Sequence, residues 1–175
     1  MDTPVLETER LLLRHFTTED AEFILALLNE PSFLRYIGDK KVRNLEDARQ
    51  YILNGPVASY ERNGFGLYVV ELKEQHTPIG MCGLLKREEL PDPDIGFALL
   101  PGFWNKGFAF EAATAVLKQA RESLHLPRIL AITSLDNEAS IQLLERLGFT
   151  FERVIKPSED REELKLFTLR SVEGR

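Results

Sequence analysis

The residues best suited to chemistry form one short stretch, PGFWNKGFAFE at positions 101–111. A strand-like run at residues 95–100 enters a turn containing Gly102, and Gly107 precedes an alanine-rich run that is typical of a helix. A glycine turn that leads into a helix exposes free backbone N–H groups at the positive end of the helix dipole. Such a turn suits a phosphate or pyrophosphate group.

The same stretch also fits half of the P-loop pattern, because Gly102 and Gly107 have the G-x-x-x-x-G spacing. Phe108 and Ala109 stand where that motif needs a lysine and a serine or threonine. Without the lysine for the terminal phosphates and the hydroxyl for magnesium, nucleotide hydrolysis is disfavoured. The pattern therefore predicts a backbone cradle that holds a phosphorylated ligand without cleaving it.

The bulk composition predicts one domain, residues 1–175, in a cytoplasmic protein. Hydrophobic residues make up 43% and charged residues 29% of the 175 positions, which is ordinary for a soluble globular chain. The net charge of −6 argues against nucleic acid as a partner and leans toward cationic substrates. The single cysteine, Cys82, cannot form an internal disulfide, which suits a reducing compartment. No apolar run approaches a membrane span, so no membrane association is expected.

The hydrophobic spacing predicts an α+β (mixed α/β) fold with a mostly antiparallel central run of strands. Strands are expected at residues 11–14, 65–72, 78–85, 93–100, 128–133, 149–156 and 163–169. Helices are expected after Thr17 or Thr18, at residues 45–53, after Gly107 and at residues 138–147. Residues 29–44 indicate a loop, and Asn54, Gly55 and Pro56 are expected to end the second helix.

Three segments, read together, resemble the GNAT superfamily of acyl-CoA-dependent N-acetyltransferases. They are DIGFALLPGFW, WNKGFAFEA and SLDNEASIQLLERLGFTFE, and the last two lie about 30 residues apart. More narrowly, they resemble the branch that contains the Rim-type ribosomal-protein N-terminal acetyltransferases. The opening TERLLLRHFTTEDAEFI resembles the first strand and helix of that branch, so the likeness covers nearly the whole chain. The resemblance implies a sheet of six to seven strands, about four helices and a splayed parallel strand pair that binds CoA.

The resemblance also implies where acetyl-CoA, the co-substrate, binds, and it implies no metal. The family signature Gln/Arg-x-x-Gly-x-Gly/Ala maps to positions 104–109, where Gly107 and Ala109 match and Trp104 replaces the Gln or Arg. Backbone amides of this turn would hold the pyrophosphate, and the free edge of the preceding strand would bind pantetheine. The implied CoA-binding residues are Phe97, Leu99, Leu100, Trp104, Asn105, Lys106, Gly107, Phe108, Ala109 and Asn137.

Asp94 is the candidate base, because it begins the strand before the glycine turn, where many family members carry a base or base-relay glutamate. It is equally explained as a strand-start residue in a Pro-Asp-Pro-Asp turn, and Asp92, Glu88 and Glu89 are nearby alternatives. A lysine amine with a pKa of about 10.4 is protonated at neutral pH, whereas an α-amino group at about 7.7–8.0 is partly neutral. An enzyme acting on N-termini therefore needs less help from a base.

Asn137 and Ser140 open the helix that follows the splayed pair. Asn137 is a good N-cap, a role that would explain it alone, while its counterpart in the family also contacts pantetheine or ties down the splayed strand. The tyrosine that protonates the departing thiolate in much of the superfamily is replaced here by Leu144. In the Rim-like branch a serine at the Ser140 position is given that role, with a solvated helix serine as the alternative.

The predicted activity is direct acetyl transfer from acetyl-CoA to an amine, either a protein or peptide N-terminus or a small amine. A catalytically silent acyl-CoA-binding module is the alternative, kept open by the missing tyrosine. Cys82 is expected to be a buried structural thiol, and the three histidines form no metal pattern. The sequence leaves a monomer and a homodimer both open, and it does not identify the acceptor.

Overall fold

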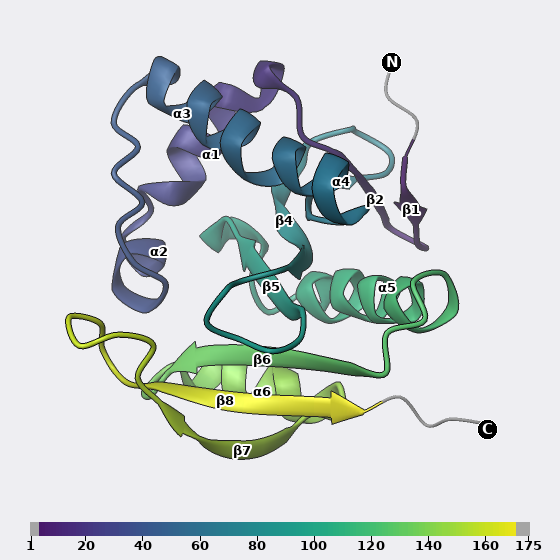
Figure 1. Ribbon diagram of the computed structural model, residues 1–175. Coiled ribbons are helices and arrows are strands. Elements are labelled where there is room, and N and C mark those ends of the chain that lie inside the picture. The colour runs from purple at the N-terminus through teal and green to yellow at the C-terminus, as the bar shows by residue number, and fades with distance from the viewer. Residues whose placement is uncertain (1–3, 171–175) are drawn as a thin grey trace.

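One eight-stranded sheet organises residues 4–170, the part of the chain that this computed structural model describes (Figure 1). The strand order is β1-β2-β3-β4-β5-β6-β8-β7, and every neighbouring pair is antiparallel except β5 and β6. The strands are β1 (Leu6–Glu7), β2 (Leu11–His15), β3 (Leu67–Leu72), β4 (Pro78–Leu85), β5 (Asp94–Leu99), β6 (Arg128–Ser134), β7 (Thr150–Ile155) and β8 (Leu164–Arg170).

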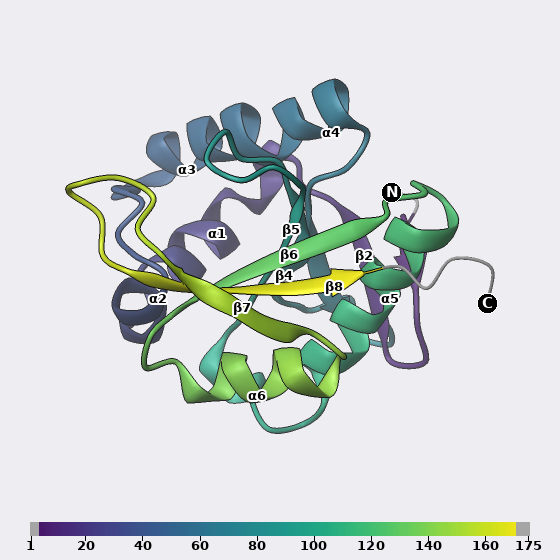
Figure 2. The same ribbon diagram turned by 60° about the horizontal axis from the view of Figure 1, so that its bottom comes forward.

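Helices cover both faces of the sheet (Figure 2). They are α1 (Ala21–Leu28), α2 (Pro31–Tyr36), α3 (Leu45–Ile52), α4 (Ala58–Asn63), α5 (Phe108–Glu122) and α6 (Glu138–Arg146). The core on one face joins apolar residues of α5 and α6 to the sheet, and the core on the other joins α1, α2 and α3 to it. The predicted α+β class is confirmed.

The N-terminal helical region is longer than the sequence pattern indicated. Residues 29–44, expected to be a loop, contain α2, which has Pro31 in its first turn and buries Phe33 in the core shared with α1 and α3. The expected stop at Asn54–Pro56 is also wrong, because a π-helical turn (Leu53–Val57) carries the chain from α3 into α4. Pro56 is buried inside this π-helical turn. The wider turn lets the backbone stay helical although it contains a proline.

Among the described residues the sheet has eight strands, whereas the resemblance implied six to seven. The same residues form six α-helices, whereas about four were implied. The additional strand β1 is two residues long and pairs with β2 at the sheet edge. A two-residue strand has no measurable alternation, which is why the hydrophobic pattern missed it.

The helix α5 forms because its apolar residues recur along one face. Phe108, Ala112, Ala113, Val116, Leu117 and Ala120 are buried, and Ala109 is half-buried. The small alanine side chains on this face let α5 pack closely over β4 and β5. Close approach recurs within the sheet, since a Cβ at Gly83 would lie 2.0 Å from the Gly66 carbonyl oxygen. The core therefore fixes α5, and with it the turn that precedes it.

Candidate functional site

The parallel pair β5 and β6 is joined at one register position only, Asp94 opposite Leu130. Beside it, the Leu130 N–H donates to the Pro93 carbonyl at 2.9 Å. Further along, the strands diverge, and residues 96–99 of β5 are half-buried although the strand lies in the middle of the sheet. The splayed parallel pair implied by the sequence is therefore present.

The free edge of β5 offers specific main-chain groups. The Leu100 N–H donates to the Ile79 carbonyl at 2.8 Å, and Leu100 also accepts from the Phe103 N–H at 3.0 Å. Because backbone groups alternate sides in an antiparallel pair, Phe97 and Leu99 direct theirs away from β4, toward the opening. Phe97 and Leu99 are thus available to an extended ligand. Leu100, predicted beside them, has both main-chain groups used within the protein.

Trp104 lies at the end of this edge. Its indole Nε1–H donates to the Leu99 carbonyl oxygen at 2.9 Å, and 44% of the residue is exposed. The Leu99 carbonyl is therefore occupied, which leaves the Leu99 N–H and both groups of Phe97 at the opening. Trp104 ties the glycine turn to the last residue of β5.

The glycine turn has the backbone shape expected of an anion cradle. Asn105 and Gly107 adopt left-handed conformations with φ of 61° and 83°. Gly107 is the N-cap of α5, and no described side chain caps the N–H groups of that first turn. Asn105, Lys106 and Gly107 are exposed, while Phe108 is buried beneath them. The first turn of α5 therefore leaves N–H groups without a side-chain partner among the described residues, an arrangement that suits an anion.

Two charged residues that were not predicted from the sequence, Arg10 and Glu111, stabilise this turn through hydrogen bonds. Arg10 Nη1 donates to the Lys106 carbonyl at 3.0 Å, and Arg10 Nε donates to Glu111 Oε1 at 2.8 Å. Glu111 also accepts hydrogen bonds from the Thr8 hydroxyl and from the Arg10 N–H. Both residues lie inside the segments that carry the family resemblance, TERLLLR and WNKGFAFEA, but no spacing in the sequence links them.

Asp94 lies at the point where the two strands part, and it is fully buried. Both of its carboxylate oxygens accept from Arg87 Nε, at 3.0 and 3.2 Å. Burial raises the pKa of this carboxyl above the ordinary aspartate value, while the charge and hydrogen bonds of Arg87 act in the opposite direction. A raised pKa suits a base, but the buried carboxylate can reach an amine only through an intervening donor such as water.

Asn137 caps α6, as its sequence position suggested. Its Oδ1 accepts from the Ser140 N–H at 3.2 Å. Ser140 is half-buried in the first turn of α6, and Leu144 is buried one turn further on. Just before the cap, Asp136 accepts from Arg35 Nη2 of α2 at 2.6 Å. This exposed ion pair links the two helical layers across the open end of the splayed strands.

Loops from three parts of the chain meet near the start of β5. The β7–β8 loop lies near α2 in both ribbon views, and the segment that follows α2 leads on to α3 (Figures 1 and 2). Lys40 comes from that segment, and its pKa is lowered by desolvation and then by repulsion from Arg87 and Arg161. Arg161 in turn pairs with Glu89 at 3.3 Å. The local charge is mixed, so the net charge of the chain does not describe this region.

Two further polar groups are buried. Cys82 is 1% exposed in β4, and burial raises the pKa of its thiol, in agreement with the structural role expected of it. The hydroxyl of Thr133 on β6 is also buried, and it has no hydrogen-bond partner among the described residues. By alternation along β6, Thr133 shares the face of Ile129 and Ala131, under α5 and α6.

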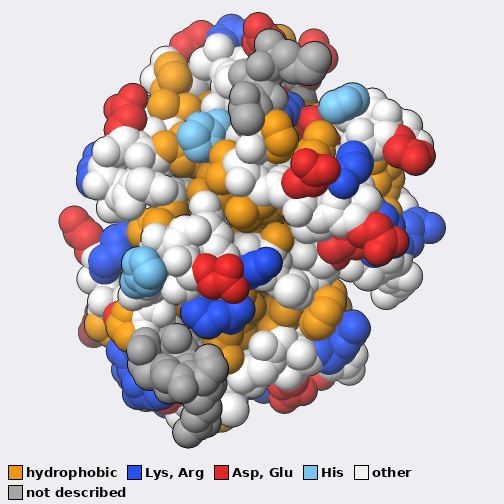
Figure 3. All heavy atoms as spheres, turned by 90° about the vertical axis from the view of Figure 1, so that its right-hand side faces the viewer, with side chains coloured by type: hydrophobic (Ala, Val, Ile, Leu, Met, Phe, Trp, Pro, Cys, Tyr) orange, Lys and Arg blue, Asp and Glu red, His pale blue; other side chains and the backbone are white. Residues whose placement is uncertain are grey.

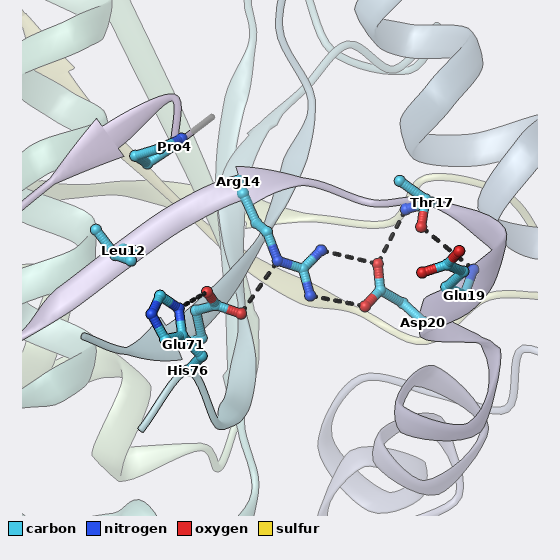
Figure 4. A pocket seen from close by; sticks show the side chains of 8 residues that line it. All are labelled: Pro4, Leu12, Arg14, Thr17, Glu19, Asp20, Glu71 and His76. Carbon is cyan, nitrogen blue, oxygen red and sulfur yellow. Dashed lines mark hydrogen bonds and ion pairs between the residues drawn. The ribbon is translucent and has the colours of Figure 1, made fainter. Parts of the chain in front are cut away.

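A cavity of about 260 Å³ lies elsewhere, over β2 and β3 (Figure 4). Its centre is Arg14, which pairs with Asp20 at 2.8 Å and with Glu71 at 3.1 Å, while His76 Nδ1 lies 3.1 Å from Glu71. None of the residues predicted to bind CoA lines it. Four of the groups that line this cavity, Arg14, Asp20, Glu71 and His76, are joined in one chain of contacts, which indicates a structural role in joining β2, β3 and the start of α1.

On the face that Figure 3 shows, basic and acidic side chains are interspersed rather than gathered by sign. Within residues 4–170, no cluster of three or more His, Cys, Asp or Glu side chains has an arrangement that could hold a metal ion. No helix in that range is long and apolar enough to cross a membrane.

The chain is similar to known acetyltransferases along most of its length. The family profile "Acetyltransferase (GNAT) domain" matches residues 10–150. The chain is 34% identical over 155 residues to "Uncharacterized N-acetyltransferase YoaA" of Bacillus subtilis (strain 168), covering 87% of this chain and 86% of that protein. A solved acetyltransferase from Agrobacterium tumefaciens str. C58 has a TM-score of 0.82 at 27% identity, covering 98% of this chain and 96% of that one.

A solved complex of RimL, a ribosomal L7/L12 alpha-N-protein acetyltransferase, with coenzyme A also has a TM-score of 0.82. The two chains are 18% identical, and the match covers 96% of this chain and 98% of RimL. At that identity the likeness shows a shared fold.

Proposed function

Because the chain belongs to the acetyltransferase (GNAT) family and is an N-acetyltransferase, we propose that it transfers acetyl from acetyl-CoA directly to an α-amino group. The observation that supports this most is the parallel pair β5–β6, joined at Asp94–Leu130 and open beyond it. An open strand edge followed by an uncapped helix start matches a ligand with an extended amide arm and a pyrophosphate.

In this proposal pantetheine binds along β5 as an added strand would. The free groups of Phe97 and the Leu99 N–H pair with its two amides, and Trp104 closes the end of the edge. The pyrophosphate lies on the N–H groups of Asn105, Lys106, Gly107, Phe108 and Ala109. RimL, which shares the fold, is bound to coenzyme A in its solved complex. Leu100 contributes through its side chain, since its main-chain groups are used internally.

The reaction forms one C–N bond and breaks one C–S bond. The neutral amine attacks the thioester carbonyl carbon, the electron pair of the C–S bond leaves with sulfur, and the nitrogen loses a proton. Asp94 receives that proton through water, because its carboxylate is buried and paired with Arg87. Ser140 is proposed to donate a hydrogen bond to the departing thiolate and to pass it a proton that water replaces on the hydroxyl; a thiol pKa near 8.5 makes this help modest at neutral pH.

The burial of Asp94 limits which kind of amine it can deprotonate, and so indicates the class of acceptor. A buried carboxylate acting through water is poorly placed to deprotonate a lysine side chain with a pKa of about 10.4, whereas an α-amino group at about 7.7–8.0 is already partly neutral. We therefore propose a peptide or protein N-terminus as the acceptor. RimL, which shares the fold, is described as an alpha-N-protein acetyltransferase, and this supports the proposed acceptor class.

The test compares two matched peptides with acetyl-CoA at neutral pH. One has a free N-terminus and no lysine, and the other has a blocked N-terminus and one lysine. Release of the CoA thiol is followed with a thiol-reactive dye, to which the buried Cys82 of the folded protein is silent. We expect release with the free N-terminus and at least about tenfold less with the lysine peptide. Saturable CoA binding with no release in either case, or in a panel of small amines, would favour the silent binding module instead.

A further inference from the structure

Arg10 contacts the glycine turn from a distant part of the sequence. It lies between β1 and β2, yet its guanidinium reaches the Lys106 carbonyl, the Glu111 carboxylate and the Phe108 ring, whose centroid is 4.3 Å from Cζ. We propose that Arg10 is a positioning residue for the pyrophosphate of CoA: it orients the Gly107 N–H and neutralises Glu111. This role rests on the proposed function.

The orientation follows from the geometry of one peptide unit. In a trans peptide the C=O and the following N–H point in opposite directions. Arg10 Nη1 holds the Lys106 carbonyl at 3.0 Å, so the Gly107 N–H of the same unit must point away from Arg10, to the outer side of the turn. The Gly107 carbonyl is also fixed, because it accepts from the Glu111 N–H at 3.0 Å. Both peptide units around Gly107 are therefore set before any ligand arrives.

Arg10 also neutralises the Glu111 carboxylate, whose negative charge lies close to the proposed pyrophosphate site. Glu111 lies in the first turn of α5, where its charge would compete with a pyrophosphate for the helix N-terminus. Arg10 Nε and the Arg10 N–H donate to its two oxygens at 2.8 and 2.9 Å, and the Thr8 hydroxyl donates as well. The carboxylate is thus held beneath the turn with its charge balanced by the guanidinium.

Gly107 and Arg10 are matched sterically. A Cβ at position 107 would lie 3.2 Å from Arg10 Nη2, which is tighter than ordinary contact, and the φ of 83° already disfavours other residues. A side chain here would press against the guanidinium that holds the turn and require it to shift slightly. Glycine at position 107 therefore allows Arg10 to come close to the turn, and it also allows the left-handed backbone conformation.

The test uses two acetyl donors that differ only in the part the turn would bind. Acetyl-CoA carries the pyrophosphate, and S-acetylpantetheine lacks it. For Arg10→Ala we expect the Kd of CoA and the KM of acetyl-CoA to rise about tenfold with kcat within about twofold, as for loss of a charge-assisted hydrogen bond. The KM for S-acetylpantetheine should not change. Arg121→Ala is the control, because it removes the same charge from the exposed end of the same helix.

Arg10→Lys is the second variant. A lysine keeps the charge near Glu111, but one ammonium cannot reproduce the fork that reaches both Glu111 and the Lys106 carbonyl, so CoA binding should still weaken. Equal CoA affinity in wild type and both variants, or equal losses with the two donors, would overturn the positioning role alone. Failure of both variants to fold would overturn it too, by assigning Arg10 to the fold. A wild-type protein that does not bind CoA would instead refute the proposed function.

Discussion

Trp104 donates its indole N–H to the carbonyl of Leu99, the last residue of β5, at a distance of 2.9 Å. The bond joins the glycine turn to the strand edge proposed to bind pantetheine. The side chain occupies the position where the family signature has Gln or Arg, and like those residues it supplies a donor.

Replacing Trp104 with phenylalanine keeps an aromatic ring but removes that donor. One neutral hydrogen bond contributes about 1 kcal/mol, so we expect CoA affinity to fall about fivefold, measured by titration calorimetry. Trp104 is also the single tryptophan of the chain, so its fluorescence should change when CoA binds to the wild-type protein. Unchanged fluorescence at a CoA concentration that saturates the heat signal would place CoA away from this turn.

Asp94→Asn tests the proposed base. An ionised carboxylate is needed to accept a proton, so wild-type activity should rise with pH through a pKa above the ordinary aspartate value, in the direction given by burial of the carboxyl. Removing the base should lower kcat about 10²-fold and remove that acidic limb from the pH–rate profile.

Asp92→Asn is the matched control for Asp94→Asn. Asp92 lies two residues earlier and pairs with Arg128 at 2.7 Å, so its replacement makes the same charge change outside the splayed pair. We expect its pH–rate profile to follow that of the wild type. A profile for Asp94→Asn that keeps the acidic limb would restrict Asp94 to its ion pair with Arg87.

Asn137 offers a way to separate helix capping from ligand contact. Asn137→Ala removes the side-chain oxygen that accepts from the Ser140 N–H and should lower the free energy of unfolding by about 1 kcal/mol. Asn137→Ser keeps a capping oxygen, so its stability should stay close to wild type. If the amide also contacts pantetheine, as the family resemblance implies, both variants should weaken CoA binding equally. If Asn137→Ser binds CoA with wild-type affinity, the role of Asn137 is limited to capping α6.

Glu111 makes stability depend on pH in a defined direction. Burial opposes its ionisation, but hydrogen bonds from Thr8 and Arg10 outweigh this and lower its pKa below the ordinary glutamate value. A carboxyl whose folded pKa is depressed stabilises the fold above its unfolded pKa, about 4.3, and loses that contribution as pH falls through the folded value. The Tm advantage of wild type over Glu111→Gln should therefore be present at pH 7 and shrink below about pH 4. An advantage that grows on acidification would contradict this assignment.

The sequence predicted the elements whose signals are local. Gly107 before an alanine-rich stripe marked the start of α5, and Asn137 marked the start of α6, because caps and periodicity act over a few residues. At residues 29–44 and at Pro56 the sequence pattern indicates breaks that the structure does not have, because proline and glycine disfavour a helix. The helices continue there because Phe33 and Pro56 are buried in the tertiary fold.

Site contacts between distant segments were not predictable. Arg10 and Glu111 are 101 positions apart, and Arg87 meets Asp94 only because the loop before β5 folds back on itself. Nothing in residue spacing encodes such pairs. Even within β5, the fact that Leu100 uses its N–H and carbonyl internally depends on the register with β4, which the strand pattern alone does not fix.

Thr133 and Thr168 lie on the neighbouring strands β6 and β8 and provide a matched pair for the last prediction. Both are buried, but the Thr168 hydroxyl donates to Glu152 at 2.7 Å, whereas the Thr133 hydroxyl has no described partner. Burying an unpaired hydroxyl costs about 1–3 kcal/mol, so Thr133→Val should raise Tm by about 2–4 °C, while Thr168→Val should lower it. Because the Thr133 hydroxyl is inaccessible, its replacement should leave the Kd of CoA unchanged. A different result, weaker CoA binding in Thr133→Val with an unchanged or higher Tm, would contradict this prediction. It would show that β5 and β6 separate further when CoA binds and that the Thr133 hydroxyl then forms a hydrogen bond with the ligand.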